Sequence, residues 1–227
     1  MTPEQLSFDL PARPALGRAD FMVSPGNALA VAMIEGWQSW PGARCALIGP
    51  KGAGKTHLTR VWASLAGAEV LAAAALTEED VPCLAAAPVA IEDVPEIAGT
   101  SVQAALFHLT NLCAAQGTPL LLSGGPEPVH WGLTLPDLAS RVAALPVAAL
   151  GDPDDALLAG VLAKLFADRQ LTPRADVIPY LVAHMERSFV AAGEIVAALD
   201  AAALAQKRAI TRPLAAALLE QRGLDPT

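Results

Sequence analysis

The chain has 227 residues, enough for one medium-sized domain and a small second one. It is rich in hydrophobic residues and poor in aromatic ones, which is typical of a helix-rich globular protein with an aliphatic core. The net charge of −8 argues against direct DNA binding, because duplex affinity comes mainly from lysines and arginines that neutralise phosphates. No apolar run approaches the roughly 20 residues that span a bilayer, and the N-terminus lacks a secretory pattern. We therefore expect a cytoplasmic protein that does not associate with membranes.

The three cysteines are Cys45, Cys83 and Cys113. They are far apart in the sequence and odd in number, so they predict buried free thiols and neither a disulfide framework nor a zinc site.

The elements predicted up to residue 150 alternate between helices and strands. Residues 1–19 contain several prolines and little periodicity, which predicts an extended arm. Apolar residues at helical spacing predict helices over 27–36, 56–66 and 102–115. Apolar runs of strand length lie at 45–48, 69–73, 87–91, 119–122 and 145–150. This alternation predicts an α/β domain, residues 20–150, in which helices flank a parallel five-stranded sheet.

The rest of the chain, residues 151–227, is predicted to be a small all-helical domain. Asp152, Asp154 and Asp155 surround Pro153 in a pattern typical of a helix start, where carboxylates cap the first turn. Helical patterns then occupy 154–168, 175–184, 189–206 and 212–220.

Residues 49–56 read GPKGAGKT and fit the G-x-x-x-x-G-K-[ST] phosphate loop in full. The segment lies between a predicted strand and a predicted helix, so glycine N–H groups and the helix N-terminus can surround phosphate oxygens. In such loops the lysine, here Lys55, reaches the β and γ phosphates, and the hydroxyl of Thr56 ligates Mg²⁺. The other interpretation is a glycine-rich turn with a chance Lys-Thr pair; the flanking elements favour ADP or ATP binding. The expected nucleotide contacts in this segment are Pro50, Lys51, Gly52, Ala53, Gly54, Lys55, Thr56 and His57.

Glu92 and Asp93 follow the predicted strand at 87–91. We expect Glu92 to face the Mg²⁺ ion and to hold it through its water ligands, and Asp93 to orient or polarise the attacking water. The alternative is an acidic turn that caps a strand. Glutamate is longer by one methylene than the usual aspartate, so we expect weak intrinsic hydrolysis.

These residues resemble a known family. The resemblance is carried by Phe21-Met22-Val23 with Asn27, by Gly54-Lys55-Thr56-His57-Leu58 and by Glu92-Asp93, which are similar to the bacterial initiator DnaA. No helix-turn-helix region follows the helical tail, so the chain resembles the DnaA-related Hda family, which inactivates the initiator after replication begins. The resemblance runs from Gln5 to about Leu219. It implies a P-loop AAA+ fold with a helical lid, and nucleotide contacts from Phe21, Met22 and Val23.

The segment Gln5–Leu10 resembles the peptide by which Hda docks on the DNA polymerase III β sliding clamp. Gln5 offers amide donors and an acceptor to a polar pocket, while Leu6, Phe8 and Leu10 offer apolar anchors to a groove. Alternatively, this alternating segment packs on its own domain as an edge strand. Clamp docking would place the protein at the nucleoid and the replisome.

Three further residues resemble functional positions of the family. Arg141 resembles the arginine finger, which acts in trans on a nucleotide held by a neighbouring subunit; otherwise it is a surface arginine before a strand. Arg187 matches the sensor 2 arginine, which touches the chain's own phosphates, or else forms a salt bridge at a helix cap. Ser123 is the sensor 1 candidate, with a plain turn as an equal alternative.

The leading hypothesis is a regulator that binds adenine nucleotide and the clamp, and that inserts Arg141 into the ATP site of DnaA. Its own nucleotide would then be structural, and self-association into a homo-oligomer is compatible with it. The alternative is a helicase-loader-like ATPase that hydrolyses its own ATP. A nucleotide kinase shares the phosphate loop but would need an arginine-rich lid that the sequence does not show.

Overall fold

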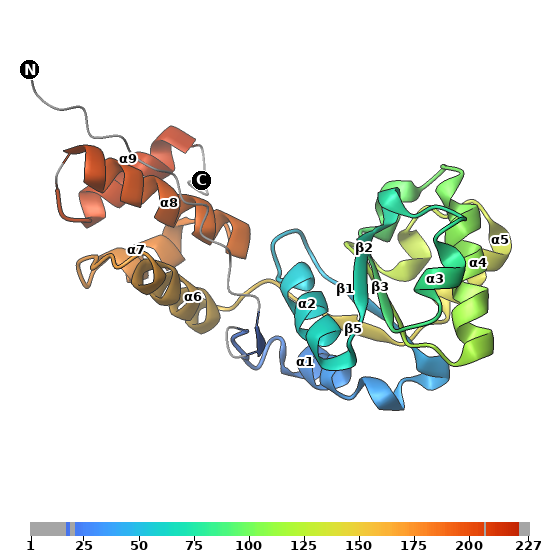
Figure 1. Cartoon of the computed structure of the whole chain (residues 1–227). Coiled ribbons are helices and arrows are strands. Elements are labelled where there is room, and N and C mark those ends of the chain that lie inside the picture. Colours follow the sequence, from blue (N-terminus) through green and yellow to red (C-terminus); the bar gives the residue numbers. More distant parts are fainter. Residues whose placement is uncertain (1–16, 19–20, 207, 223–227) are drawn as a thin grey trace, which may run out of the picture.

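The computed structural model describes residues 17–18, 21–206 and 208–222, which form an α/β domain followed by a helical domain (Figure 1). The α/β domain is built on a five-stranded sheet in the order β2-β3-β4-β1-β5, and every neighbouring pair is parallel. The strands are β1 (Arg44–Ile48), β2 (Glu69–Ala72), β3 (Val89–Glu92), β4 (Leu120–Gly124) and β5 (Val147–Ala149). The predicted parallel sheet is therefore confirmed.

Helices cover both faces of this sheet, because its central strands are apolar on both sides. Successive side chains of a strand point to opposite faces. Ala46 and Ile48 of β1 accordingly pack in the core with α3 (Val81–Leu84), α4 (Val102–Gln116) and α5 (Pro136–Ala143). Cys45 and Leu47 pack in the other core, with α1 (Ala28–Glu35) and α2 (Lys55–Ala66).

Short 3₁₀ turns complete the α/β domain at Trp37–Ser39, Pro41–Ala43, Ala73–Ala75, Val94–Ile97 and Pro128–His130.

The helical domain, called the lid below, has a core of its own. It consists of α6 (Asp155–Asp168), α7 (Val177–His184), α8 (Phe189–Gln206) and α9 (Arg212–Arg222). Asp154 caps α6, since its Oδ1 accepts a hydrogen bond of 2.7 Å from the N–H of Leu157. Figure 1 shows the lid beside the end of the α/β domain at which α2 begins.

Three features differ from the prediction. The four-residue helix α3 and helix α5 were not predicted, although Pro136 in the first turn of α5, followed by Asp137, is a helix-start signal. Cys83 is exposed, whereas Cys45 and Cys113 are buried as expected; all three are free thiols. Within the described ranges, no helix is long and apolar enough to cross a bilayer.

Candidate functional site

The phosphate loop, residues 49–54, connects the carboxyl end of β1 to the first residue of α2. Gly52 has a φ of 80° and Gly54 a φ of 92°, a conformation that favours glycine. A Cβ on Gly52 would lie 2.7 Å from the Cβ of Ser188 in the lid. Glycine is therefore needed here both for the turn of the loop and for the close approach of the lid.

Lys55 lies across the inside of this loop. Its Nζ donates hydrogen bonds of 2.8 Å to the carbonyl of Gly49 and 3.0 Å to that of Pro50. Burial lowers the pKa of Lys55, and the charges of Asp93 and Glu92 partly offset this. Phosphate oxygens are stronger acceptors than neutral carbonyls, so the loop fits a polyphosphate that would take over these donors.

Glu92, the last residue of β3, is the buried acid of the site, with 9% of its surface exposed. Burial is the main cause that raises its pKa, and a hydrogen bond from the hydroxyl of Thr56 partly offsets it. Its Oε1 has no hydrogen-bond partner among the described residues. A buried carboxylate oxygen without a partner, beside a threonine hydroxyl, fits a hydrated Mg²⁺ ion.

Asp93 follows Glu92 with φ 58° and ψ 44°, a left-handed conformation that is uncommon outside glycine. Its N–H donates a hydrogen bond of 3.3 Å to Oγ of Ser123. Ser123 is buried in β4, which lies between β3 and β1 in the sheet. The structure thus brings Lys55, Asp93 and Ser123 together at the carboxyl ends of three adjacent strands.

Gly124 belongs to β4 and therefore does not form a plain turn after Ser123. A Cβ on Gly124 would lie 2.6 Å from Cε2 of Trp131, so the absence of a side chain at Gly124 leaves room for the indole. Trp131 is 1% exposed, and its Nε1 donates a hydrogen bond of 2.8 Å to the carbonyl of Pro126. Trp131 is thus a packing residue of the α/β core.

The segment before α1 forms one wall of a cleft next to the loop. The side chain of Asn27 holds this segment, since its Oδ1 accepts from the N–H of Ser24 at 2.8 Å and its Nδ2 donates to the carbonyl of Met22 at 3.0 Å. The ring of Phe21 meets that of His57 edge to face, with centroids 5.1 Å apart. Phe21, Met22 and His57 all line the cleft.

The cleft has a volume of about 880 Å³ and lies between the phosphate loop and the lid. Leu157, Val161 and Leu165 of α6 line its lid side. They repeat every four residues and so form one stripe of the helix. Such a stripe offers an apolar surface to a flat ring such as a nucleobase.

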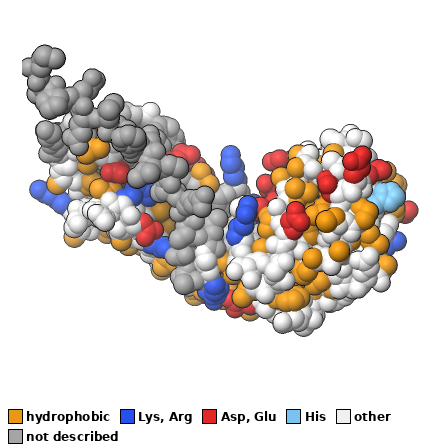
Figure 2. Space-filling view, in the orientation of Figure 1, with side chains coloured by type: hydrophobic (Ala, Val, Ile, Leu, Met, Phe, Trp, Pro, Cys, Tyr) orange, Lys and Arg blue, Asp and Glu red, His pale blue; other side chains and the backbone are white. Residues whose placement is uncertain are grey.

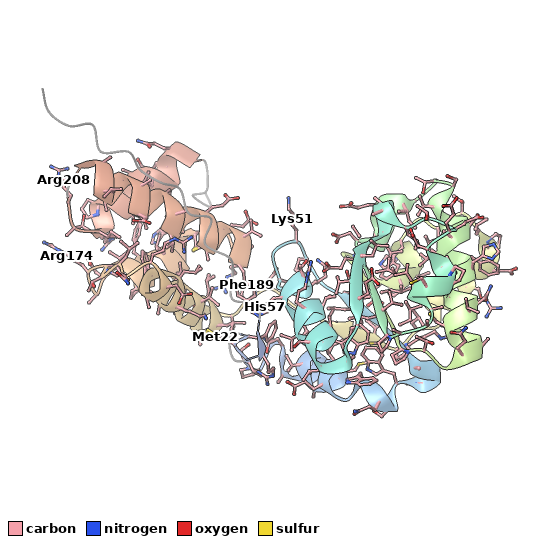
Figure 3. All side chains as sticks on the ribbon, in the orientation of Figure 1. Met22, Lys51, His57, Arg174, Phe189 and Arg208 are labelled. Carbon is pink, nitrogen blue, oxygen red and sulfur yellow. The ribbon has the colours of Figure 1, made fainter. Side chains whose placement is uncertain are left out.

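The cleft includes most of the predicted nucleotide contacts and some residues that the sequence did not indicate. The predicted ones are Phe21, Met22, Lys51, Gly52, Gly54, Lys55, Thr56 and His57, with Asp93. Val23, Pro50, Ala53 and Arg187 were predicted but do not line it. Figure 3 shows Met22, His57 and Phe189 gathered between the lid and the α/β domain, with Lys51 extending from the loop. Figure 2 shows Lys and Arg side chains at the opening between the two parts.

The start of α8 contacts the phosphate loop directly. The N–H of Phe189 donates a hydrogen bond of 2.9 Å to the carbonyl of Gly52. Arg187, two residues earlier, forms an ion pair with Asp155 and donates at 3.2 Å to the carbonyl of Pro153. In this structure Arg187 therefore makes a salt bridge near the start of α6, and its predicted contact with phosphate stays a prediction.

Residues 155–219 match the family model for the lid domain of Hda. Domain III of the replication initiation protein DnaA from Thermotoga maritima matches with a TM-score of 0.80 at 20% identity, over 93% of this chain and 98% of that one. The lid is thus similar to that of Hda, and the chain as a whole shares the AAA+ fold of DnaA domain III; we call it Hda-like for this similarity.

Other solved structures share the fold of this Hda-like protein. AMPPCP-bound DnaA from Aquifex aeolicus has a TM-score of 0.69 at 19% identity, over 83% of this chain and 66% of that one. The Holliday junction branch migration motor RuvB from Thermotoga maritima has a TM-score of 0.65 at 16% identity, over 85% of this chain and 65% of that one. The chain thus spans about two thirds of these two proteins, and the likeness establishes the AAA+ fold. The sequence matches no curated protein.

In the Hda-like protein, Arg141 lies far from the phosphate loop. It is exposed near the end of α5, and its guanidinium lies 5.9 Å from the ring centroid of Phe107. It shares a surface pocket with Arg44, the first residue of β1, whereas the loop follows the last residue of that strand. Successive residues of β1 rise about 3.3 Å each, so its first and last residues lie roughly 13 Å apart. Arg141 therefore does not serve the phosphate loop of its own chain in this structure.

Gln5, Leu6, Phe8 and Leu10, the predicted clamp-binding residues, lie outside the described part of the chain.

Proposed function

We propose that this Hda-like protein regulates replication initiation by promoting hydrolysis of ATP bound to DnaA. One observation carries the proposal: the phosphate loop and Arg141 lie at opposite ends of β1. One chain can therefore hold a nucleotide of its own while it presents a guanidinium to the nucleotide of another subunit. The match of the lid to Hda supports DnaA as that subunit.

The chain's own nucleotide, ADP or ATP, would occupy the cleft. Lys55 and the N–H groups of the loop bind its phosphates, and Phe21, Met22 and the apolar stripe of α6 contact its base. A bound Mg²⁺ ion would neutralise phosphate charge, with Thr56 and Glu92 as its nearest protein groups. Because the cleft contacts both the loop and the lid, the nucleotide fixes their relative orientation, and its main role is structural.

Arg141 would act in trans. During phosphoryl transfer, negative charge spreads over the oxygens of the transferred group, and a guanidinium placed against them stabilises this charge. A finger of this kind accelerates hydrolysis by about 10³ to 10⁵-fold. Arg141 is exposed, and the ring of Phe107 in α4 lies 5.9 Å from its guanidinium.

The N-terminal arm would tether the protein to the β sliding clamp, and so to the replisome in the cytoplasm. Gln5 fills a polar pocket while Leu6, Phe8 and Leu10 fill an apolar groove. The test is a titration of the clamp with the intact chain and with a variant in which Gln5 and Leu6 are both alanine. We expect binding to be lost in the variant; equal binding by both would remove the clamp from the proposal.

The deciding experiment measures hydrolysis of ATP bound to DnaA in the presence of the clamp on DNA. The chain is compared with Arg141→Ala and with Arg174→Ala, an exposed arginine at the far end of the lid (Figure 3). We expect Arg141→Ala to lose the stimulation and Arg174→Ala to keep it. Full stimulation by Arg141→Ala would refute the proposal, and DNA-stimulated turnover by the chain alone would instead favour the loader-like ATPase.

A further inference from the structure

A second pocket, called the foot pocket below, lies at the end of the sheet opposite to the phosphate loop. It has a volume of about 340 Å³. Its walls come from the turn that leads into β1 and from the segment between α5 and β5: Pro41, Gly42, Arg44, Arg141, Ala144, Leu145 and Pro146. No carboxylate lines it among the described residues.

The foot pocket carries two guanidinium groups without a described counter-ion. Neither Arg44 nor Arg141 forms an ion pair in the described part of the chain. The charge of Arg44 lowers the pKa of Cys113, but burial outweighs this effect and raises the pKa of that thiol to about 11. The thiol is therefore neutral at pH 7 and does not balance the arginine.

Arg44 also has an unused donor. Its Nε is buried and has no hydrogen-bond partner among the described residues. The residue is held close to the turn before β1, where a Cβ on Gly42 would lie 3.2 Å from Nη2 of Arg44; Gly42 has a φ of 61°. A buried N–H without an acceptor is costly, and the position therefore favours a ligand that brings acceptor oxygens.

We propose that Arg44 and Arg141 together form a binding site for the polyphosphate of a nucleotide held by a neighbouring AAA+ subunit. This inference rests on the proposed function and adds a second residue, Arg44, to the finger. Phosphate oxygens match guanidinium groups geometrically, and a polyphosphate has enough charge to face two of them. It would also remove the repulsion between the two like charges in one pocket.

The first test uses pyrophosphate as the probe and needs no partner protein. The chain is saturated with ADP and Mg²⁺ to fill the phosphate loop, and pyrophosphate binding is measured by calorimetry for the wild type, Arg44→Gln, Arg141→Gln and the control Arg174→Gln. We expect one further site in the wild type and the control, weakened at least tenfold in the other two variants. No further site, or one that both pocket variants retain, would overturn the inference.

The second test measures hydrolysis of DnaA-bound ATP with the same variants. We expect Arg44→Gln to lower the stimulated rate about tenfold without changing clamp binding, and Arg44→Lys, which keeps the charge, to recover part of it. Equal melting temperatures of the variants exclude a folding defect. If Arg141→Gln abolishes stimulation and Arg44→Gln does not, the inference fails and the proposed function stands. If Arg141→Gln stimulates normally, the proposed function fails together with the partner-nucleotide role of the pocket.

Discussion

Replacing Glu92 with glutamine should stabilise the nucleotide-free protein. Glu92 is buried at the end of β3, its Oε1 has no described partner, and burial raises its pKa above the ordinary value of 4.5. The fold therefore holds this carboxyl group in an environment that disfavours its charged form. Glutamine removes the charge but keeps a polar group at this position, so we expect a gain of about 1 kcal/mol, which corresponds to a melting temperature shift of about 2–4 °C for a chain of this size.

The pH dependence identifies the cause. A carboxyl group with a raised pKa in the folded state binds more protons when folded, so its penalty is complete above that pKa and declines as the pH falls through it. The difference in melting temperature between Glu92→Gln and the wild type should therefore be larger at pH 8 than at pH 5. Thermal unfolding without nucleotide measures it. A difference that is zero, negative or independent of pH would refute the reasoning.

The same variant should lose part of the effect of Mg²⁺. In the wild type, Mg²⁺ should increase the thermal stabilisation by ADP, because Glu92 supplies a charge beside Thr56. We expect a smaller increase in Glu92→Gln. An unchanged increase would show that Glu92 does not face the ion.

Three other outcomes are expected. Replacing Lys55 with alanine should weaken ADP binding about 10- to 100-fold in a titration, because the charged donor that now contacts the loop carbonyls is lost. Gly124→Ala should cost about 1–3 kcal/mol in denaturant unfolding because its Cβ would overlap Trp131, whereas Gly125→Ala, with nothing within 4 Å, should change little. Asp154→Ala should lower the melting temperature. Since the backbone hydrogen bond at the helix start lowers the pKa of Asp154, its contribution is present above the ordinary carboxyl pKa and is lost as the pH falls through the lowered one.

The sequence was sufficient to predict the sheet and the loop. The strands are short apolar runs buried on both faces, and the loop pattern stands between a strand and a helix, so local signals agree with the tertiary structure. The position of Glu92 and Asp93 followed from the same logic, because the carboxyl ends of parallel strands meet at one edge.

Other parts of the site depend on tertiary contacts. In α6, Leu158 packs in the lid core while its neighbour Leu157 lines the cleft. Both residues are apolar, so the sequence pattern alone does not show which of them faces the core and which faces the cleft. Similarly, nothing near Gly124 in the sequence indicates that Trp131 returns to pack on it. Arg187 pairs with Asp155, a residue that is distant in the sequence.

The central claim is that the chain acts on the nucleotide of another subunit. Loading the two proteins with different nucleotides tests this claim most directly. The Hda-like protein is loaded with AMPPCP, which its own site cannot hydrolyse, and is mixed with the clamp on DNA and with DnaA that carries labelled ATP. We predict that the labelled ATP is hydrolysed as fast as with an ADP-loaded chain, and that Arg141→Ala abolishes this. Hydrolysis that stops when the chain's own nucleotide is non-hydrolysable, or that persists without Arg141, would contradict the account.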